Sequence, residues 1–146
     1  EIGSGVIYDS HGVRVTSIRV HHGNWDEALA YRFDTPSRSV IVSGDARYDE
    51  GLIEPGRGVD VLVHEVYAGA RLKPEQRPGG EDWPRYMRDF HTSDTELGAL
   101  AARIKPKLLV LTHIVRMGAT DDELLAGIRA GGYKGRVVVG HDLDRY

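Results

Sequence analysis

Runs of apolar residues divide the chain into seven predicted strands. Residues 13–20 alternate apolar and polar side chains with period two, which is typical of a half-buried strand. Residues 59–63 and 108–112 are more continuously apolar, which is typical of strands covered on both faces. Shorter runs predict the remaining strands, at residues 6–8, 28–33, 39–43 and 136–140. We expect the first four strands to form an antiparallel meander.

Two later segments carry apolar side chains at helical spacing. Residues 95–104 place four of them on one helical face, and Thr92 or Ser93 precedes the segment as a candidate N-cap. Residues 121–130 follow Thr120, which is another N-cap residue, and end at a pair of glycines. Strands therefore come first and then alternate with helices. The pattern predicts an α+β fold, with a mixed sheet and helices packed on one face.

The stretch from residue 69 to residue 90 interrupts this regular pattern. It is rich in proline, glycine and charged residues, so we expect a long loop between two secondary-structure elements. Long loops in compact domains commonly carry function.

Composition limits the classes of protein that this chain can represent. Its 146 residues suit one domain, and 40% hydrophobic with 28% charged residues is ordinary for a globular protein. No cysteine is present, which excludes disulfides and thiolate metal sites and leaves the cellular compartment undetermined. No apolar run reaches the length of a membrane span. The net charge of −3 leads us to expect no large nucleic acid as a partner.

Histidine and acidic side chains follow several of the predicted strands. Because ligands converge at the ends of strands along one sheet edge, these residues are candidates for a common site. Imidazole and carboxylate groups are the ligand types of zinc and other divalent metals. The residues at these strand ends are His22, Asp45, His64, Glu65, His113 and Asp142.

Each candidate also has a purely structural interpretation. A histidine at a strand end, such as His22 or His113, can simply hydrogen-bond a loop carbonyl. Asp45 lies in a common Ser-Gly-Asp turn and can cap it. Glu65 could belong to a surface pair with its neighbouring histidine, and His91 could be part of a helix-capping neighbourhood. The arrangement as a whole favours a metal site more than any single residue does.

In their order along the chain, these motifs resemble the second half of the metallo-β-lactamase-fold hydrolases, and most closely the ribonuclease Z and arylsulfatase-like branch. Three departures are conservative: Ala30 stands where the family often has glycine, Ala46 where it usually has threonine, and the two hydroxyl residues of His91-Thr92-Ser93 are in altered order. The family's upstream His-x-His-x-Asp-His motif has no match in this sequence. The motifs that carry the resemblance are His22, Ala30-Tyr31-Arg32-Phe33, Ser43-Gly44-Asp45, His64-Glu65, His91-Thr92-Ser93 and Leu111-Thr112-His113.

The resemblance implies an αββα fold of which residues 1–146 form the C-terminal half, with the N-terminal half that holds the metal motif missing. It implies that His22 and His113 each bind one of two divalent metal ions and that Asp45 bridges both. His91 would stabilise developing charge or protonate the leaving group, and Glu65 would orient His91 or a metal ligand. Asp45, His91 and Glu65 are thus the implied catalytic residues.

The implied reaction is attack by a dinuclear metal-activated hydroxide on a phosphodiester or related ester of a small molecule. Zinc is preferred from the ligand types, and manganese or iron would suit the same nitrogen and oxygen donors. Because this chain offers each ion about two ligands, we expect it to bind metal weakly and to be inactive alone. A sheet with one bare face should pair with the missing half or self-associate.

Two alternatives belong to other functional classes. The chain could be a non-catalytic β-sheet interaction module, in which the histidines are structural and chelators have no effect. It could also be a lactonase or thioesterase on the same scaffold, which a panel of substrates would separate from a phosphodiesterase.

Overall fold

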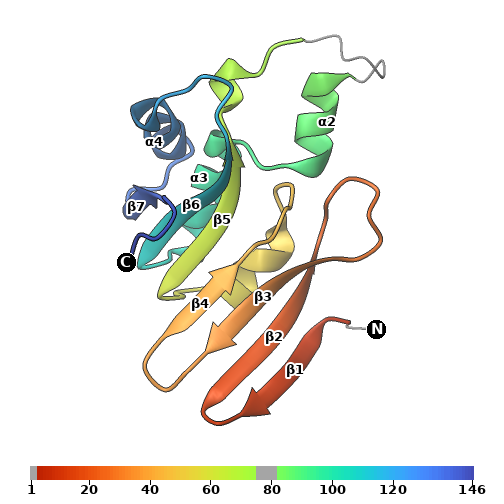
Figure 1. Cartoon of the computed structure of the whole chain (residues 1–146), viewed down its shortest axis with the longest axis vertical. Helices are drawn as coiled ribbons and strands as arrows, with labels where there is room; N and C mark the ends of the chain where they lie inside the picture. The colour runs from red at the N-terminus through yellow and green to blue at the C-terminus, as the bar shows by residue number, and fades with distance from the viewer. Residues whose placement is uncertain (1–2, 75–81) are drawn as a thin grey trace.

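The computed structural model describes residues 3–74 and 82–146, which build a seven-stranded mixed sheet whose strand order follows the chain (Figure 1). The first four strands pair antiparallel and the last four pair parallel. The predicted strands, the antiparallel meander and the α+β class are thereby confirmed. The strands are β1 (Gly5–Ser10), β2 (Val13–Val20), β3 (Ala28–Asp34), β4 (Ser39–Val42), β5 (Val61–Tyr67), β6 (Leu108–Val115) and β7 (Arg136–Val139).

Both predicted helices form, and both begin with a capping box. In α3 (Asp94–Ile104) the Ser93 side chain accepts a hydrogen bond from the Glu96 backbone N–H, and the Glu96 carboxylate accepts one from Ser93 in return. The Thr120 side chain caps α4 (Asp121–Ala130) in the same way. In the part of the chain that the structure describes, no helix combines the length and the hydrophobicity that a membrane crossing requires.

Sequence patterns did not predict the shorter helices. Between β4 and β5 lie the 3₁₀ helix η1 (Glu50–Leu52) and the single turn α1 (Ile53–Gly56). The stretch from residue 69 to residue 90, expected to be a loop, instead contains η2 (Gly69–Arg71) and α2 (Trp83–Phe90). Asp82 caps α2 by accepting from the Arg85 backbone N–H. Residues 75–81 lie outside the described residues.

One face of the sheet is covered by helices and carries the hydrophobic core. In Figure 1, α1 and α3 lie behind the sheet as drawn. Side chains from these helices and from α4 pack with alternate residues of the central strands. The fully buried members with the largest side chains are Ile41, Leu52, Leu62, Leu97, Leu100, Ile104, Leu109, Leu111, Leu124 and Ile128.

The other face of the sheet is also largely apolar, but no described helix covers it. Side chains alternate between faces along a strand, so the neighbours of the core residues point to this second face. They line up across the sheet in register, and most of them are only half-buried. We call this set the open face; its members are Leu29, Tyr31, Phe33, Val40, Val42, Val61, Val63, Val110 and Val138.

Candidate metal centre

The strand directions bring the predicted site residues to one edge of the sheet. β2 runs antiparallel to β3, and β3 antiparallel to β4, so β2 has the same direction as β4, β5 and β6. The carboxyl ends of these four strands therefore share an edge. His22 follows β2, Asp45 follows β4, and Glu65 and His113 lie near the ends of β5 and β6.

His91 occupies the middle of this group. It is the residue that ends α2, and its ring centroid lies 5.3 Å from that of His22 and 5.6 Å from that of His113. His113 Nδ1 is 3.7 Å from an Asp45 carboxylate oxygen and 3.9 Å from a Glu65 carboxylate oxygen. The five predicted site residues thus form one cluster in the structure. Asp142 has no described contact with it.

Glu65 and His91 form a buried pair. His91 Nδ1 lies 3.0 and 2.9 Å from the two Glu65 carboxylate oxygens, and the Glu65 side chain is completely buried. Burial raises the pKa of the Glu65 carboxyl above its ordinary value, although the hydrogen bond from His91 acts in the opposite direction. The bond fixes the orientation of the His91 ring and leaves Nε2 available for another partner.

A backbone carbonyl fixes the orientation of His22. Its Nδ1 donates a hydrogen bond to the carbonyl oxygen of Phe90 at 2.7 Å, and the Phe90 ring contacts it edge-on at 5.0 Å. This contact with a loop carbonyl is the one that the structural interpretation of His22 expects. It is equally the arrangement of many metal-binding histidines, because a bond at one ring nitrogen sets the tautomer and directs the other toward an ion.

A β-bulge places His113 in the cluster. Glu65 pairs with Thr112 and Val66 with Ile114, so His113 is the extra residue between two rungs of the β5–β6 ladder. Its φ of 40° lies in the left-handed region, which side chains other than glycine seldom occupy. Bulges and strained residues are concentrated at functional sites, where they redirect a side chain. The period-two pattern of β6 could not reveal this irregularity.

Two hydrogen bonds to the backbone of Ala46, the residue after Asp45, hold the loop that carries Asp45. The Ala46 backbone N–H donates to a Glu65 carboxylate oxygen at 2.6 Å, and its carbonyl oxygen accepts from the Thr92 hydroxyl at 2.7 Å. Ala46 and Thr92 are both completely buried. Glu65, which belongs to the cluster, and Thr92, which follows His91, therefore fix the backbone next to Asp45.

His21 and Asp49 tie the same loop to the end of β2. The Asp49 carboxylate accepts from the His21 backbone N–H at 3.0 Å and contacts His21 Nδ1 at 2.6 Å. The Arg47 backbone N–H donates to the His21 carbonyl oxygen at 2.8 Å. Sequence analysis did not identify Thr92, His21 or Asp49 as positioning residues. The only sign of such a role in the sequence is that Thr92 lies next to His91, His21 lies next to His22, and Asp49 lies shortly after Asp45.

His64 is a strand-end candidate that the structure places outside this cluster. It is completely buried on the helix-covered face, and burial lowers its pKa to about 4. Its Nδ1 donates to the Glu65 carbonyl oxygen at 2.8 Å, whereas Nε2 has no hydrogen-bond partner. The interpretation of His64 and Glu65 as a surface pair is therefore wrong, because strand alternation sends the two buried side chains to opposite faces.

Comparisons with known proteins are consistent with this geometry. A model of the beta-lactamase superfamily domain matches residues 1–114. The chain belongs to the beta-lactamase superfamily. Ribonuclease Z of Mycobacterium tuberculosis (strain ATCC 25618 / H37Rv) is 29% identical over an alignment covering 99% of this chain and 52% of the relative. Ribonuclease Z of Mycobacterium avium (strain 104) is 31% identical, with 97% and 49% covered. The chain thus spans about half the length of these curated relatives.

Solved structures show the same fold. The metallo-beta-lactamase fold protein YhfI from Bacillus subtilis superposes with a TM-score of 0.69 at 20% identity, covering 91% of this chain and 48% of that one. The short form of human tRNase Z gives a TM-score of 0.62 at 17% identity, with 95% and 44% covered. The resemblance to metallo-β-lactamase-fold proteins of the ribonuclease Z branch is confirmed, as is the expected fold class.

The expectation that excluded a large nucleic acid as a partner is wrong. The relatives are named ribonuclease Z and tRNase Z, and those names describe proteins that act on RNA. Net charge was a poor guide because it sums over the whole sequence given, whereas an RNA-binding site needs cations only where the phosphates lie. The sum also covers only about half of the length of such relatives.

The fold family implies divalent metal ions, and the residues at this edge fit them. The ligand atoms of His22, Glu65 and His91 all lie within 4.8 Å of one another. Asp45 and His113 extend the same group with one more carboxylate and one more imidazole. Nitrogen and oxygen donors of this kind suit zinc, manganese or iron. Since Glu65 already accepts hydrogen bonds from Ala46 and His91, its carboxylate is less available as a ligand than that of Asp45.

Proposed function

We propose that this chain is the C-terminal half of a metal-dependent hydrolase that cleaves phosphodiester bonds. One observation carries the proposal: His22, Asp45, Glu65, His91 and His113 converge at one sheet edge, and backbone or carboxylate hydrogen bonds already orient His22 and His91. Preorganised donors of this kind are a property of metal centres and of active sites.

His22, Asp45 and His113 would hold the metal, with two ions in the complete enzyme. Bound divalent ions supply Lewis acidity that activates water and stabilises negative charge. The Asp45 carboxylate and the His113 ring are half-exposed, so both could bind an ion without any rearrangement of the core. Three such donors do not saturate two ions, so the remaining ligands would come from a segment outside these 146 residues.

His91 would provide the proton or the hydrogen bond that the leaving oxygen needs. The Glu65 carboxylate fixes the ring through Nδ1, so that Nε2 is left for an oxygen on which charge develops. Glu65 acts here through His91 and through Ala46, and it is therefore a positioning residue for both His91 and the Asp45 loop.

The open face indicates where the missing segment would lie. Apolar side chains of the five adjacent strands β3 to β7 face away from the helices, most of them only half-buried, and the candidate site lies at the edge of this surface. A second apolar layer packed against it would remove this surface from water and approach His22 and His113 from the side that this chain leaves uncovered.

A complementation experiment tests the proposal. The chain is co-expressed with the part of Mycobacterium tuberculosis ribonuclease Z that it does not match, and the complex is assayed with bis(p-nitrophenyl) phosphate and added zinc. We expect hydrolysis that falls by roughly 10²- to 10⁴-fold in His91→Ala, as general acid–base catalysis predicts. His141→Ala, which removes an exposed histidine elsewhere, serves as the matched control. Equal activity of the two variants would contradict the role of His91, and hydrolysis of a neutral lactone only would contradict the phosphodiester assignment.

A further inference from the structure

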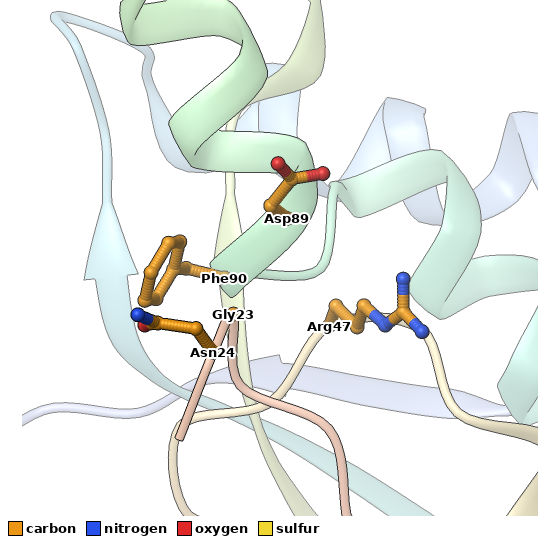
Figure 2. Close-up of a pocket in the computed structure, with 5 residues that line it drawn as sticks. All are labelled: Gly23, Asn24, Arg47, Asp89 and Phe90. Atoms are coloured by element: carbon orange, nitrogen blue, oxygen red, sulfur yellow. The ribbon is translucent and has the colours of Figure 1, made fainter. Parts of the chain in front are cut away.

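The cavity shown in Figure 2 belongs to the surroundings of the candidate metal centre, since Gly23 directly follows His22 and Arg47 lies two residues after Asp45. The residues that line it are Gly23, Asn24, Arg47, Asp89 and Phe90. A different cavity, of ≈ 370 Å³, lies between η2, α3 and α4, and no residue of the candidate metal centre lines it. Its volume is within the range of small-molecule sites. This second cavity has no role in the function proposed above.

Small apolar residues form most of the wall of the second cavity, which we call the alanine cavity. Its polar lining residues are Arg71, Asp94, Thr95 and Glu123, and none of the residues that line it is aromatic. A ligand would therefore meet short methyl groups over most of its surface and a few polar groups that fix its orientation. The small residues are Ala68, Ala70, Ala119, Ala126, Gly127 and Ala130.

Asp94 is the buried polar group of the alanine cavity. It begins α3 and is only 3% exposed. Its Oδ1 atom accepts hydrogen bonds from the Gly69 backbone N–H at 3.3 Å, from the Thr95 backbone N–H at 2.8 Å and from the Thr95 hydroxyl at 3.4 Å. Its Oδ2 atom accepts no hydrogen bond from any residue that the structure describes. One carboxylate oxygen is thus fully used, whereas the other lacks a donor.

The unpartnered oxygen is directed toward α4 at the cavity wall. A Cβ added at Gly127 would lie 2.2 Å from Asp94 Oδ2, so a glycine is needed there to leave room for the carboxylate. Within residues 3–74 and 82–146, the single side-chain nitrogen or oxygen atom that is both fully enclosed and without a partner is His64 Nε2. Asp94 Oδ2 therefore keeps an accessible surface, and it faces the cavity that Asp94 and Gly127 line together.

No described cation pairs with the Asp94 carboxylate. The described ion pair at the cavity joins Arg71 to Glu123, with the Arg71 Nε atom 3.1 Å from a Glu123 carboxylate oxygen. Burial raises the pKa of the Asp94 carboxyl above its ordinary value, although its hydrogen bonds act in the opposite direction. In its ionised form, Asp94 is therefore a negative charge without a counter-charge, and a bound cation would neutralise it.

We propose that the alanine cavity binds a small organic cation with a primary ammonium group. The ammonium donates a charge-assisted hydrogen bond to Asp94 Oδ2, and the alkyl part of the ligand packs against the alanines. A quaternary ammonium ligand does not fit this wall, because such a group is held by aromatic rings and has no N–H to donate. The inference is independent of the proposed hydrolysis.

Titration of the ¹⁵N-labelled, metal-free chain with three small probes tests this inference. Pentylammonium, 1-pentanol and pentanoate share an apolar body and differ in the charge of the head group, and EDTA keeps the amine from binding a metal ion. Amide chemical shifts in two-dimensional NMR spectra report both the affinity and the location. We expect pentylammonium to shift the signals of Gly69, Thr95 and Gly127. It should bind roughly tenfold or more tightly than 1-pentanol, with pentanoate the weakest.

Two variants with matched controls locate the binding site. Asp94→Asn removes the charge and should weaken pentylammonium binding roughly tenfold or more, whereas Asp122→Asn, in the first turn of α4, should leave it unchanged. Ala126→Leu fills the cavity from an exposed position of α4 and should weaken the binding of pentylammonium and 1-pentanol alike. Ala102→Leu, on α3 and outside the cavity lining, is its control. Circular dichroism verifies that each variant is folded.

The same titrations can overturn the proposal. Equal affinity for pentylammonium and 1-pentanol would show an apolar cavity without a cation site, and no binding of any probe would show no site at all. Unchanged binding in Asp94→Asn, or in Ala126→Leu if Asp94→Asn does not fold, would show that the probe binds elsewhere. Shifts confined to the loops of His22 and Asp45 would do the same. None of these measurements involves a metal ion or hydrolysis, so they test the alanine cavity separately from the proposed function.

Discussion

The two faces of the sheet carry similar apolar side chains, but helices cover only one of them in the described part of the chain. Within β5, Leu62 is completely buried beneath the helices, whereas the adjacent Val61 and Val63 on the open face are half-buried. Within β4, Ile41 and its neighbour Val40 differ in the same way. Both faces carry branched apolar side chains, yet only one of them has a described layer to pack against.

This difference explains the position of the candidate site. The packed core beneath the helices holds the parallel strands β4, β5 and β6 in register, and the candidate site residues lie beside the open face, from which the proposed substrate and further metal ligands would approach. Glu65 lies at the boundary: it is buried, but its carboxylate is directed to His91 and to the Asp45 loop. The molecule therefore has one sheet face packed beneath helices and one apolar face that no described helix covers.

The largest expected effect compares one leucine from each face. Leu62→Ala on the helix-covered face should lower the free energy of unfolding by about 4 kcal/mol, because a cavity remains in a closed core. Leu29→Ala on the open face should cost about 1 kcal/mol, since this side chain is only half-buried. Urea denaturation of the two variants measures both values. Equal losses would show that the open face is covered in solution.

The pH dependence of stability should report on His64, which lies on the helix-covered face. The folded protein holds this ring neutral down to a pKa of about 4, whereas the unfolded chain protonates it near 6.5. The unfolded chain therefore binds more protons between these values, and the free energy of unfolding should fall by up to about 3 kcal/mol as the pH is lowered from 6.5 to 4.

His64→Leu should remove this component of the pH dependence, and His141→Leu, at an exposed position, should retain it. Urea titrations at half-unit pH intervals provide the measurement. A wild-type curve that superposes on that of His64→Leu would contradict the buried neutral state of His64.

The N-caps of α3 and α4, which pack on the helix-covered face, should make smaller contributions to the free energy of unfolding. Ser93→Ala removes the capping box of α3 and should destabilise the protein by about 1 kcal/mol. Thr120→Ala does the same to α4 and serves as a comparison farther from His91. Thermal unfolding measures both. Because Ser93 follows His91 and Thr92, a much larger loss in Ser93→Ala would indicate that this cap also fixes the site.

The smallest effect on stability is expected on the open face itself. Phe33 is 38% exposed, so Phe33→Lys should change the free energy of unfolding by no more than about 0.5 kcal/mol. The same substitution should reduce self-association, because it places a charge within an exposed apolar surface. Sedimentation velocity over a range of concentrations measures this. Unchanged association would indicate that another surface mediates contact between copies.

Sequence patterns predicted the regular parts of this fold and missed those that depend on three-dimensional context. Period-two alternation located β2, helical spacing located α3 and α4, and the order of strands predicted the sheet. In contrast, α2 lies within the stretch for which the sequence predicts a loop, because Pro84 and a polar composition obscure its amphipathic face. The bulge at His113 leaves no mark in the alternation of β6, since it arises from the pairing of β6 with β5.

For the candidate site, the positions of residues at strand ends were informative, but the contacts between them were not. The sequence pattern singled out His22, Asp45, His91 and His113, which the structure brings together. It did not separate His64 from Glu65, because the faces to which two adjacent residues point depend on strand register. The tertiary hydrogen bonds of Ala46 likewise join segments that are distant in the chain.

The most direct test of the central claim, that this chain contributes part of a metal centre completed by a second layer on the open face, is a zinc titration by calorimetry. The chain is measured alone and in complex with the unmatched part of Mycobacterium tuberculosis ribonuclease Z. We predict weak, incomplete binding by the chain alone and about two tight ions in the complex, with tight binding lost in Asp45→Asn. Two tight sites on the 146-residue chain by itself would contradict the claim.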